Sequence, residues 1–167
     1  KLQESAAMAA VTLPNATYVP NLPQEAIDKG LISEAQLEPV VYAGQAHQQV
    51  SPEGVRRGFF IGDGTGVGKG REIAAIIWDN FRRGRKKAVW LSNNMPLLND
   101  AKRDVAGIGW DPDLVFPLAK TQYGSVPKQK EGIAFIGYDG LKGAQRREGG
   151  HTRLAQLTEW LGEGFDG

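Results

Sequence analysis

The chain has 167 residues, 20 lysines and arginines against 19 aspartates and glutamates, two histidines and no cysteine. This length suits a single domain with a sizeable core, the near-zero net charge identifies no partner, and the missing cysteines exclude disulfides, thiolate catalysis and cysteine metal sites. No apolar run approaches the roughly 18 residues of a membrane span, and no signal peptide is recognisable, so we expect a soluble intracellular protein, cytoplasmic in a bacterium or phage and nuclear in a eukaryote.

The beginning of the chain predicts an extended arm. Pro14, Pro20 and Pro23 lie there among small and polar side chains, a composition that disfavours both helix and strand. We therefore expect residues 1–24 to form an N-terminal arm and residues 25–167 to form the folded domain.

A helix is predicted after the arm. Ser33 and Gln36 have the spacing of a capping box, and the apolar residues that follow support a helix to about residue 49. Pro39 predicts either a kink or a later helix start near Glu38, because proline is tolerated only in the first turn. The apolar face weakens at Gly44, where an apolar side chain would be expected.

The central feature of the sequence is a glycine-rich loop between a predicted strand and a predicted helix. Residues 58–61 are apolar and predict a short strand, residues 62–68 form the glycine loop, and helical spacing of apolar residues predicts a helix over about 69–83. Phosphate oxygens need several backbone N–H donors that converge on one point, and glycines allow such a tight turn. The lysine and the positive helix N-terminus favour the same anion.

The loop matches the Walker A pattern with two departures. Gly68 and Lys69 occupy their expected places, whereas Asp63 stands where the first glycine would be, and Gly70 replaces the serine or threonine that usually binds magnesium. We therefore expect a nucleotide triphosphate site with magnesium ligands largely elsewhere. A glycine-rich turn without a ligand is the alternative.

Strands and helices alternate through the rest of the chain. This alternation predicts an α/β fold with a mostly parallel sheet and helices on both faces, and ligands at the carboxyl ends of the strands. The predicted elements are a strand over 87–92, a helix from 95 to about 105, a short strand over 114–118, a strand over 133–138, a polar connection over 142–150 and a helix over about 154–162.

The chain resembles the first RecA-like lobe of superfamily-2 helicases and, more closely, the strawberry notch family of helicase-like ATPases. The resemblance covers most of residues 22–167 and implies a RecA-like P-loop NTPase lobe, in which glycine at position 70 is usual. It rests on the segments 31–42 (LISEAQLEPVVY), 62–71 (GDGTGVGKGR), 90–92 (WLS), 100–104 (DAKRD) and 137–141 (GYDGL).

The resemblance implies roles for the residues of an ATP site. Gln36 would read the adenine, although a solvated helix glutamine is the alternative, and Lys69 would be the catalytic lysine on the β- and γ-phosphates. Arg71 would reach a phosphate or face solvent. The backbone that cradles the phosphates would come from Gly64, Thr65, Gly66, Val67, Gly68 and Gly70.

The resemblance also implies a nucleic-acid contact. Ser92, Asn93 and Asn94 follow one predicted strand, and Tyr138 and Asp139 follow another, where related helicases hold one strand by its backbone. The alternative is turn chemistry, which we favour for Asn94 and Asp139. The basic run over 82–87 is better explained as a helix C-terminus than as a nucleic-acid contact.

ATP hydrolysis needs an acidic Walker B residue after a hydrophobic strand. Residues 165–167 resemble the lead-in to that strand, so we expect this chain to bind ATP weakly without hydrolysing it. The longer parent protein would use ATP and Mg²⁺, a second RecA-like lobe in the same chain and nucleic acid, DNA in preference to RNA, and no membrane. A P-loop kinase or GTPase-like enzyme and a catalytically inactive RecA-like interaction module are the alternatives.

Overall fold

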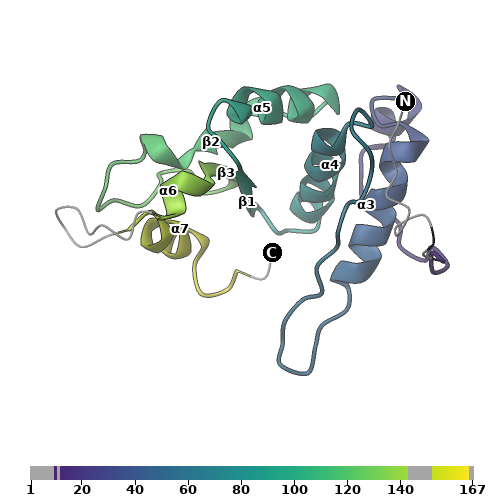
Figure 1. Ribbon diagram of the computed structural model, residues 1–167, viewed down its shortest axis with the longest axis horizontal. Helices are drawn as coiled ribbons and strands as arrows, with labels where there is room; N and C mark the ends of the chain where they lie inside the picture. The colour runs from purple at the N-terminus through teal and green to yellow at the C-terminus, as the bar shows by residue number, and fades with distance from the viewer. Residues whose placement is uncertain (1–9, 11, 143–151, 166–167) are drawn as a thin grey trace. The chain divides into compact units, whose positions relative to one another are not determined.

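The computed structural model describes residues 10, 12–142 and 152–165 (Figure 1). The chain divides into two compact units, each described by itself below. The first unit comprises Lys1–Arg83 and Gly107–Trp110, and the second comprises Gly84–Ala106 and Asp111–Gly167. No helix in the described stretches is both long and apolar enough to cross a membrane.

Two packed helices dominate the first unit. The short helix α2 (Gln24–Asp28) leads into α3 (Glu34–His47), which packs against α4 (Lys69–Arg82) (Figure 1). The predicted capping box is confirmed, because the Ser33 side chain accepts from the Gln36 N–H and the Gln36 side chain accepts from the Ser33 N–H. The later helix start near Glu38 is not observed, because the helix begins at Glu34 and contains Pro39. The capping box holds the first turn in place although Pro39 donates no backbone hydrogen bond.

Gly44, which interrupts the apolar face of α3, makes room for the arm. A Cβ atom at Gly44 would lie only 2.1 Å from Cε1 of Tyr18, so the ring of Tyr18 occupies the space that a side chain would fill. The neighbouring Gln45 side chain accepts from the Thr17 N–H at 2.8 Å and donates to the Asn15 carbonyl at 3.1 Å. The surface of α3 that looked weakly apolar is therefore the surface on which the arm lies.

A buried carboxylate on α4 completes the docking of the arm. Asp79 accepts hydrogen bonds from the Tyr18 hydroxyl and the Asn21 N–H, both at 2.5 Å, and from Nε of Arg83 at 3.0 Å. Burial, with help from the hydrogen bond to Asp79, raises the pKa of Tyr18 to about 12. Arg83 also lies over the Tyr18 ring, 4.8 Å from its centroid, and so encloses the hydrogen-bonded hydroxyl.

The first unit is completed by residues that follow α5 in the sequence. Ile108 is fully buried, and the Trp110 ring stacks on Trp78 with centroids 5.5 Å apart and planes 9° from parallel. Phe81 meets the same Trp110 ring edge-on at 4.9 Å. These aromatic contacts fix the C-terminal half of α4 within its unit.

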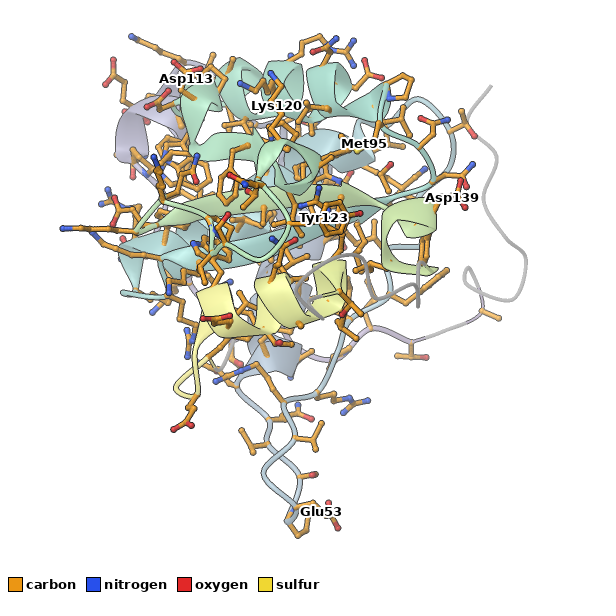
Figure 2. The ribbon with its side chains drawn as sticks, turned by 90° about the vertical axis from the view of Figure 1, so that its left-hand side faces the viewer. Glu53, Met95, Asp113, Lys120, Tyr123 and Asp139 are labelled. Carbon is orange, nitrogen blue, oxygen red and sulfur yellow. The ribbon has the colours of Figure 1, made fainter. Side chains whose placement is uncertain are left out.

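The predicted strand over residues 58–61 does not form. Phe59 and Phe60 are 39% and 75% exposed, and the described residues between α3 and α4 contain only an isolated bridge between Val50 and Arg56. Figure 2 shows this connection as a long loop with Glu53 at its tip. An apolar run becomes a strand only where another strand satisfies its backbone, and the first unit offers none in its described part.

The second unit is a parallel sheet with the strand order β1-β3-β2. Its strands are β1 (Lys87–Ser92), β2 (Val115–Pro117) and β3 (Gly132–Gly137), and its helices are α5 (Leu97–Gly107), α6 (Tyr138–Lys142) and α7 (Arg153–Leu161). Short 3₁₀ turns at Pro112–Leu114 and Leu118–Lys120 flank β2. The predicted α/β class with a parallel sheet is confirmed. The predicted connection over 142–150 lies, except for residue 142, outside the described residues.

The side chains of β3 alternate between two helical layers. Ala134 and Ile136 join a core under α7, where the Phe116 ring meets Trp160 edge-on at 5.3 Å. Ile133 and Phe135 are also fully buried and point to the opposite face. Figure 2 shows the sheet between α5 above and α7 below, so both faces are covered.

Candidate nucleotide site

The glycine loop adopts a conformation that only glycine tolerates. Gly66 and Gly68 both have φ of +99°, in the left-handed region that other residues avoid. Gly68 is the N-cap of α4, and no side chain caps this helix. No side chain therefore satisfies the first N–H groups of the helix, although the Arg71 N–H donates to the Gly68 carbonyl at 2.8 Å, and the helix dipole favours an anion there.

Lys69 folds back over the loop. Its ammonium donates to the carbonyl oxygens of Asp63 at 2.9 Å and Gly64 at 3.1 Å, and the side chain is half-buried. These neutral acceptors hold the charge at the loop without neutralising it. A phosphate at the loop would offer the ammonium a stronger, charged acceptor.

Gln36 supports the loop from α3. The side chain is only 9% exposed, its oxygen accepts from the Ser33 N–H at 3.1 Å, and its nitrogen donates to the Val67 carbonyl at 2.8 Å. A Cβ atom at Gly68 would lie 2.5 Å from the same nitrogen, so this position needs glycine for space as well as for conformation. Gln36 is thus no solvated helix glutamine, and its reading of adenine stays a prediction.

Arg71 is directed into the first unit. Its Nη1 donates to the Leu31 carbonyl at 3.4 Å, and a Cβ atom at Gly107 would lie 3.0 Å from its Nε. The side chain therefore packs against neighbouring backbone, and a contact with phosphate stays a prediction. Within the loop, Thr65 and Gly66 are exposed, whereas Gly64, Val67 and Gly70 are half-buried.

Sequence reasoning missed a pair of acidic residues at the base of the loop. Glu72, in the first turn of α4, is 0% exposed, and neither of its carboxyl oxygens has a hydrogen-bond partner; the buried Oδ2 of Asp63 has none either. Burial first, and the neighbouring Asp63 carboxyl second, raise the pKa of Glu72 to about 7, and Lys69 opposes the rise. We call Asp63 and Glu72 the carboxyl pair.

A signal for the buried glutamate was present in the sequence. Glu72 lies seven residues before Asp79, two helical turns apart, so both face the same side of α4. The isoleucines suggested a different buried face, but the structure leaves Ile73, Ile76 and Ile77 half-buried and buries the two acids together with alanines. The buried residues of α4 thus combine the two acids, two alanines and Phe81, and the isoleucines are not among them.

The residues predicted to contact nucleic acid lie together in the second unit. Ser92 pairs with Gly137 in the parallel register of β1 and β3, so the segments that follow both strands start side by side. A Cβ atom at Gly137 would lie 3.7 Å from the Cα of Asn94, which confirms that the segments touch. Asn93, Asn94, Tyr138 and Asp139 are exposed, and Ser92 is half-buried.

The basic run over 82–87 is engaged within each unit. In the first unit, Arg82 donates to the Asn21 side chain at 3.2 Å and Arg83 pairs with Asp79. In the second unit, Lys86 pairs with Glu131 at 3.1 Å and Lys87 donates to the Trp160 carbonyl. These contacts agree with a structural role at and after the end of α4.

The donor set fits a nucleotide triphosphate better than a metal held by the chain alone. Lys69, the uncapped start of α4 and the two left-handed glycines suit phosphate oxygens. The described residues contain no group of three or more histidine or acidic side chains arranged for a metal ion. Gly70 also offers no hydroxyl, so a magnesium ion here would rely on the phosphates for much of its coordination.

Comparisons with known proteins agree with this geometry. The profile of the family described as "P-loop containing NTP hydrolase pore-1" matches residues 1–167. The chain is 44% identical over 170 residues to "Protein strawberry notch homolog 1" of Gallus gallus, which covers 98% of this chain and 14% of that protein. It is 42% identical over 171 residues to "Protein strawberry notch" of Drosophila melanogaster, covering 98% of this chain and 10% of that protein.

A plant protein is similar to the same extent. "Protein FORGETTER 1" of Arabidopsis thaliana is 41% identical over 168 residues, covering 98% of this chain and 13% of that protein. No solved structure matches the chain. The chain thus spans between 10% and 14% of the length of these relatives. The family match over its whole length and the relatives show that this chain belongs to the strawberry notch-like P-loop NTPases.

Proposed function

We propose that the chain is the ATP-binding N-terminal motor lobe of a nucleic-acid-dependent ATPase, a helicase or translocase of strawberry notch type. The observation that carries this proposal is the glycine loop. The loop ends at the uncapped start of α4, and the Lys69 ammonium lies 2.9 Å from the Asp63 carbonyl oxygen of the loop. These features converge on one anion-binding point.

Each group at the loop has a part in holding ATP. The loop amides and Lys69 would bind the β- and γ-phosphates, and Gln36 would leave the Val67 carbonyl or share its amide with the adenine edge. Magnesium, when bound with ATP, neutralises phosphate charge. Since Gly70 supplies no hydroxyl, the remaining protein ligands would come from the longer parent protein.

The second unit would hold the nucleic acid. Exposed amide and hydroxyl groups at Asn93, Asn94 and Tyr138 lie together after β1 and β3, and such groups suit sequence-independent contacts with phosphate and sugar. DNA is the substrate that we favour over RNA, and an intracellular location follows from such a substrate.

Titration of the chain with a fluorescent ATP analogue tests the nucleotide site. Lys69→Ala should weaken binding about tenfold or more, because a charged hydrogen bond to phosphate is lost. Lys120→Ala is the matched control, since Lys120 is exposed and lies in a 3₁₀ turn of the second unit. Equal affinity of Lys69→Ala and the unaltered chain would refute the proposal, and no binding even in the full-length parent would favour an inactive interaction module.

Fluorescence anisotropy with single-stranded DNA and RNA of equal length tests the second unit. Replacing Asn93 and Asn94 by alanine should weaken binding several-fold without changing any preference for base sequence, as expected for backbone contacts. Asn99→Ala, an exposed position on α5, is the control. The prediction fails if the double variant binds as tightly as the control, or if RNA binds more tightly than DNA.

A further inference from the structure

The carboxyl pair connects the two ends of the phosphate-binding segment. Asp63 lies at the entrance of the glycine loop and Glu72 in the first turn of α4, on either side of Lys69 in the sequence. The Asp63 carboxyl raises the pKa of Glu72, and buried oxygens of both side chains lack a partner, so the two carboxyl groups lie close together. The base of the loop is therefore closed by two acids.

Two ionised carboxylates are a poor fit for this place. A carboxylate only accepts hydrogen bonds, yet three of the four oxygens of the pair are buried without a donor. Bulk water does not reach Glu72, because the residue is 0% exposed. A single proton on Glu72 turns it into a donor to Asp63, satisfies oxygens on both residues and removes one of two facing negative charges.

We propose that Glu72 is a positioning residue, whose protonated carboxyl donates a hydrogen bond to Asp63 and so fixes the entrance of the glycine loop in its phosphate-binding shape. Asp63 is then held twice, through its side chain by Glu72 and through its carbonyl by the Lys69 ammonium at 2.9 Å. The effect on nucleotide affinity rests on the proposed function of the loop, whereas the effect on the loop itself does not.

Loss of the proton would act on Lys69 as well. With both acids ionised, two carboxylates would compete with the phosphate for the same ammonium, and their mutual repulsion would push the loop entrance away from α4. Ionised Glu72 should therefore lower nucleotide affinity both by competing for Lys69 and by displacing the loop entrance.

The direction of the pH dependence follows from the causes of the shift. Burial first and Asp63 second raise the pKa of Glu72 to about 7, while Lys69 lowers it. Because the folded-state pKa lies above the ordinary value of 4.5, the stabilisation is fully present below that value and is lost as the pH rises through about 7. The loop should therefore be ordered at pH 6 and loosened at pH 8.

The test compares the unaltered chain with Glu72→Gln, whose amide donates to Asp63 at every pH. Hydrogen exchange of the loop amides and the affinity for the fluorescent ATP analogue are measured at pH 6 and pH 8. A pKa near 7 leaves about a tenth of the molecules protonated at pH 8, so the unaltered chain should lose about tenfold in affinity beyond the loss seen in Glu72→Gln. Titration of the nucleotide phosphate is common to both and cancels.

Two further variants make the result specific. Glu159→Gln, at an exposed position of α7, should keep the full pH dependence. Asp63→Asn should weaken it without abolishing it, because the asparagine amide can donate to an ionised Glu72 while burial, the largest cause of the raised pKa, remains. This variant replaces Glu72→Gln if the latter does not fold. The inference is overturned if loop hydrogen exchange shows the same pH dependence in Glu72→Gln as in the unaltered chain. If the exchange differs as expected but no nucleotide binds at either pH, the inference stands and the proposed nucleotide site fails.

Discussion

Helix α4 carries two buried carboxyl groups that have opposite surroundings. Asp79 is 2% exposed and receives hydrogen bonds from Tyr18, Asn21 and Arg83, whereas Glu72 is 0% exposed and its oxygens have no donor. Burial removes both carboxyl groups from water, but only Asp79 receives hydrogen bonds from the protein that replace those lost with water. The end of α4 that holds the arm is therefore fixed, and the end that holds the glycine loop depends on a proton.

Removing the satisfied carboxylate should have the largest effect. Asp79→Ala leaves the Tyr18 hydroxyl, the Asn21 N–H and Arg83 without their acceptor, and we expect a loss of about 3 kcal/mol in the free energy of unfolding. Urea unfolding measures it, with the exposed Asp28→Ala as control. A loss below about 1 kcal/mol would show that the arm does not depend on Asp79.

Neutralising the unsatisfied carboxyl should do the reverse. Glu72→Gln should raise the free energy of unfolding at pH 8 by roughly 2 kcal/mol, because a pKa of about 7 against the ordinary 4.5 makes ionised Glu72 unfavourable in the fold. At pH 5 the gain should be much smaller, about 1 kcal/mol or less, since Glu72 is then protonated in the folded state. Urea unfolding of Glu72→Gln and the unaltered chain at both pH values measures the difference. A gain in stability at pH 5 as large as the gain at pH 8 would contradict the view that ionised Glu72 destabilises the fold.

The third prediction concerns the space that the arm occupies. Gly44→Ala places a Cβ atom 2.1 Å from the Tyr18 ring and should cost about 1–2 kcal/mol, although alanine favours the helix. In a Tyr18→Ala background the same substitution should instead stabilise by about 0.5–1 kcal/mol. Thermal unfolding of the four proteins gives the coupling energy, and additive effects would exclude the contact.

The smallest effect is expected from a single hydroxyl. Tyr18→Phe removes one donor to Asp79 and leaves the other two, so it should cost about 1 kcal/mol in urea unfolding. Since the pKa of Tyr18 is raised to about 12, its contribution to the ultraviolet absorbance should show no phenolate between pH 9 and pH 10.5. Ionisation of Tyr18 in this range would contradict the buried hydrogen bond.

Local signals in the sequence were enough for most helices and strands. The capping box at Ser33, the strand over 87–92 and the helix before Gly162 follow from residues within a few positions of one another. The strand over 58–61 was wrong because strand formation depends on a distant partner, which no local pattern reveals. The short helix α2 was missed, since five residues after a proline give too little periodicity to detect.

The parts of the site that lie next to one another in the sequence were predictable, and the contacts between distant residues were not. The glycines and Lys69 form a contiguous pattern, so their place at the start of α4 was expected. The bond from Gln36 to Val67 joins residues 31 positions apart, and the inward turn of Arg71 depends on Leu31 and Gly107. Glu72 was missed because its burial results from packing between elements, and its seven-residue spacing from Asp79 does not outweigh the default expectation that a charged residue on a helix is exposed.

The aromatic stack of Trp110 on Trp78 has a consequence for anyone who dissects this protein. A polypeptide that stops at Arg83 contains α2, α3 and α4 but lacks Ile108 and Trp110, so it would present the faces of Trp78 and Phe81 to water and should aggregate. Because the first unit consists of two separate stretches of the chain, it can be assembled from two polypeptides. One contains residues 1–83, and the other is a peptide that contains residues 107–110. Quenching of tryptophan fluorescence on mixing those pieces would then report their reassembly.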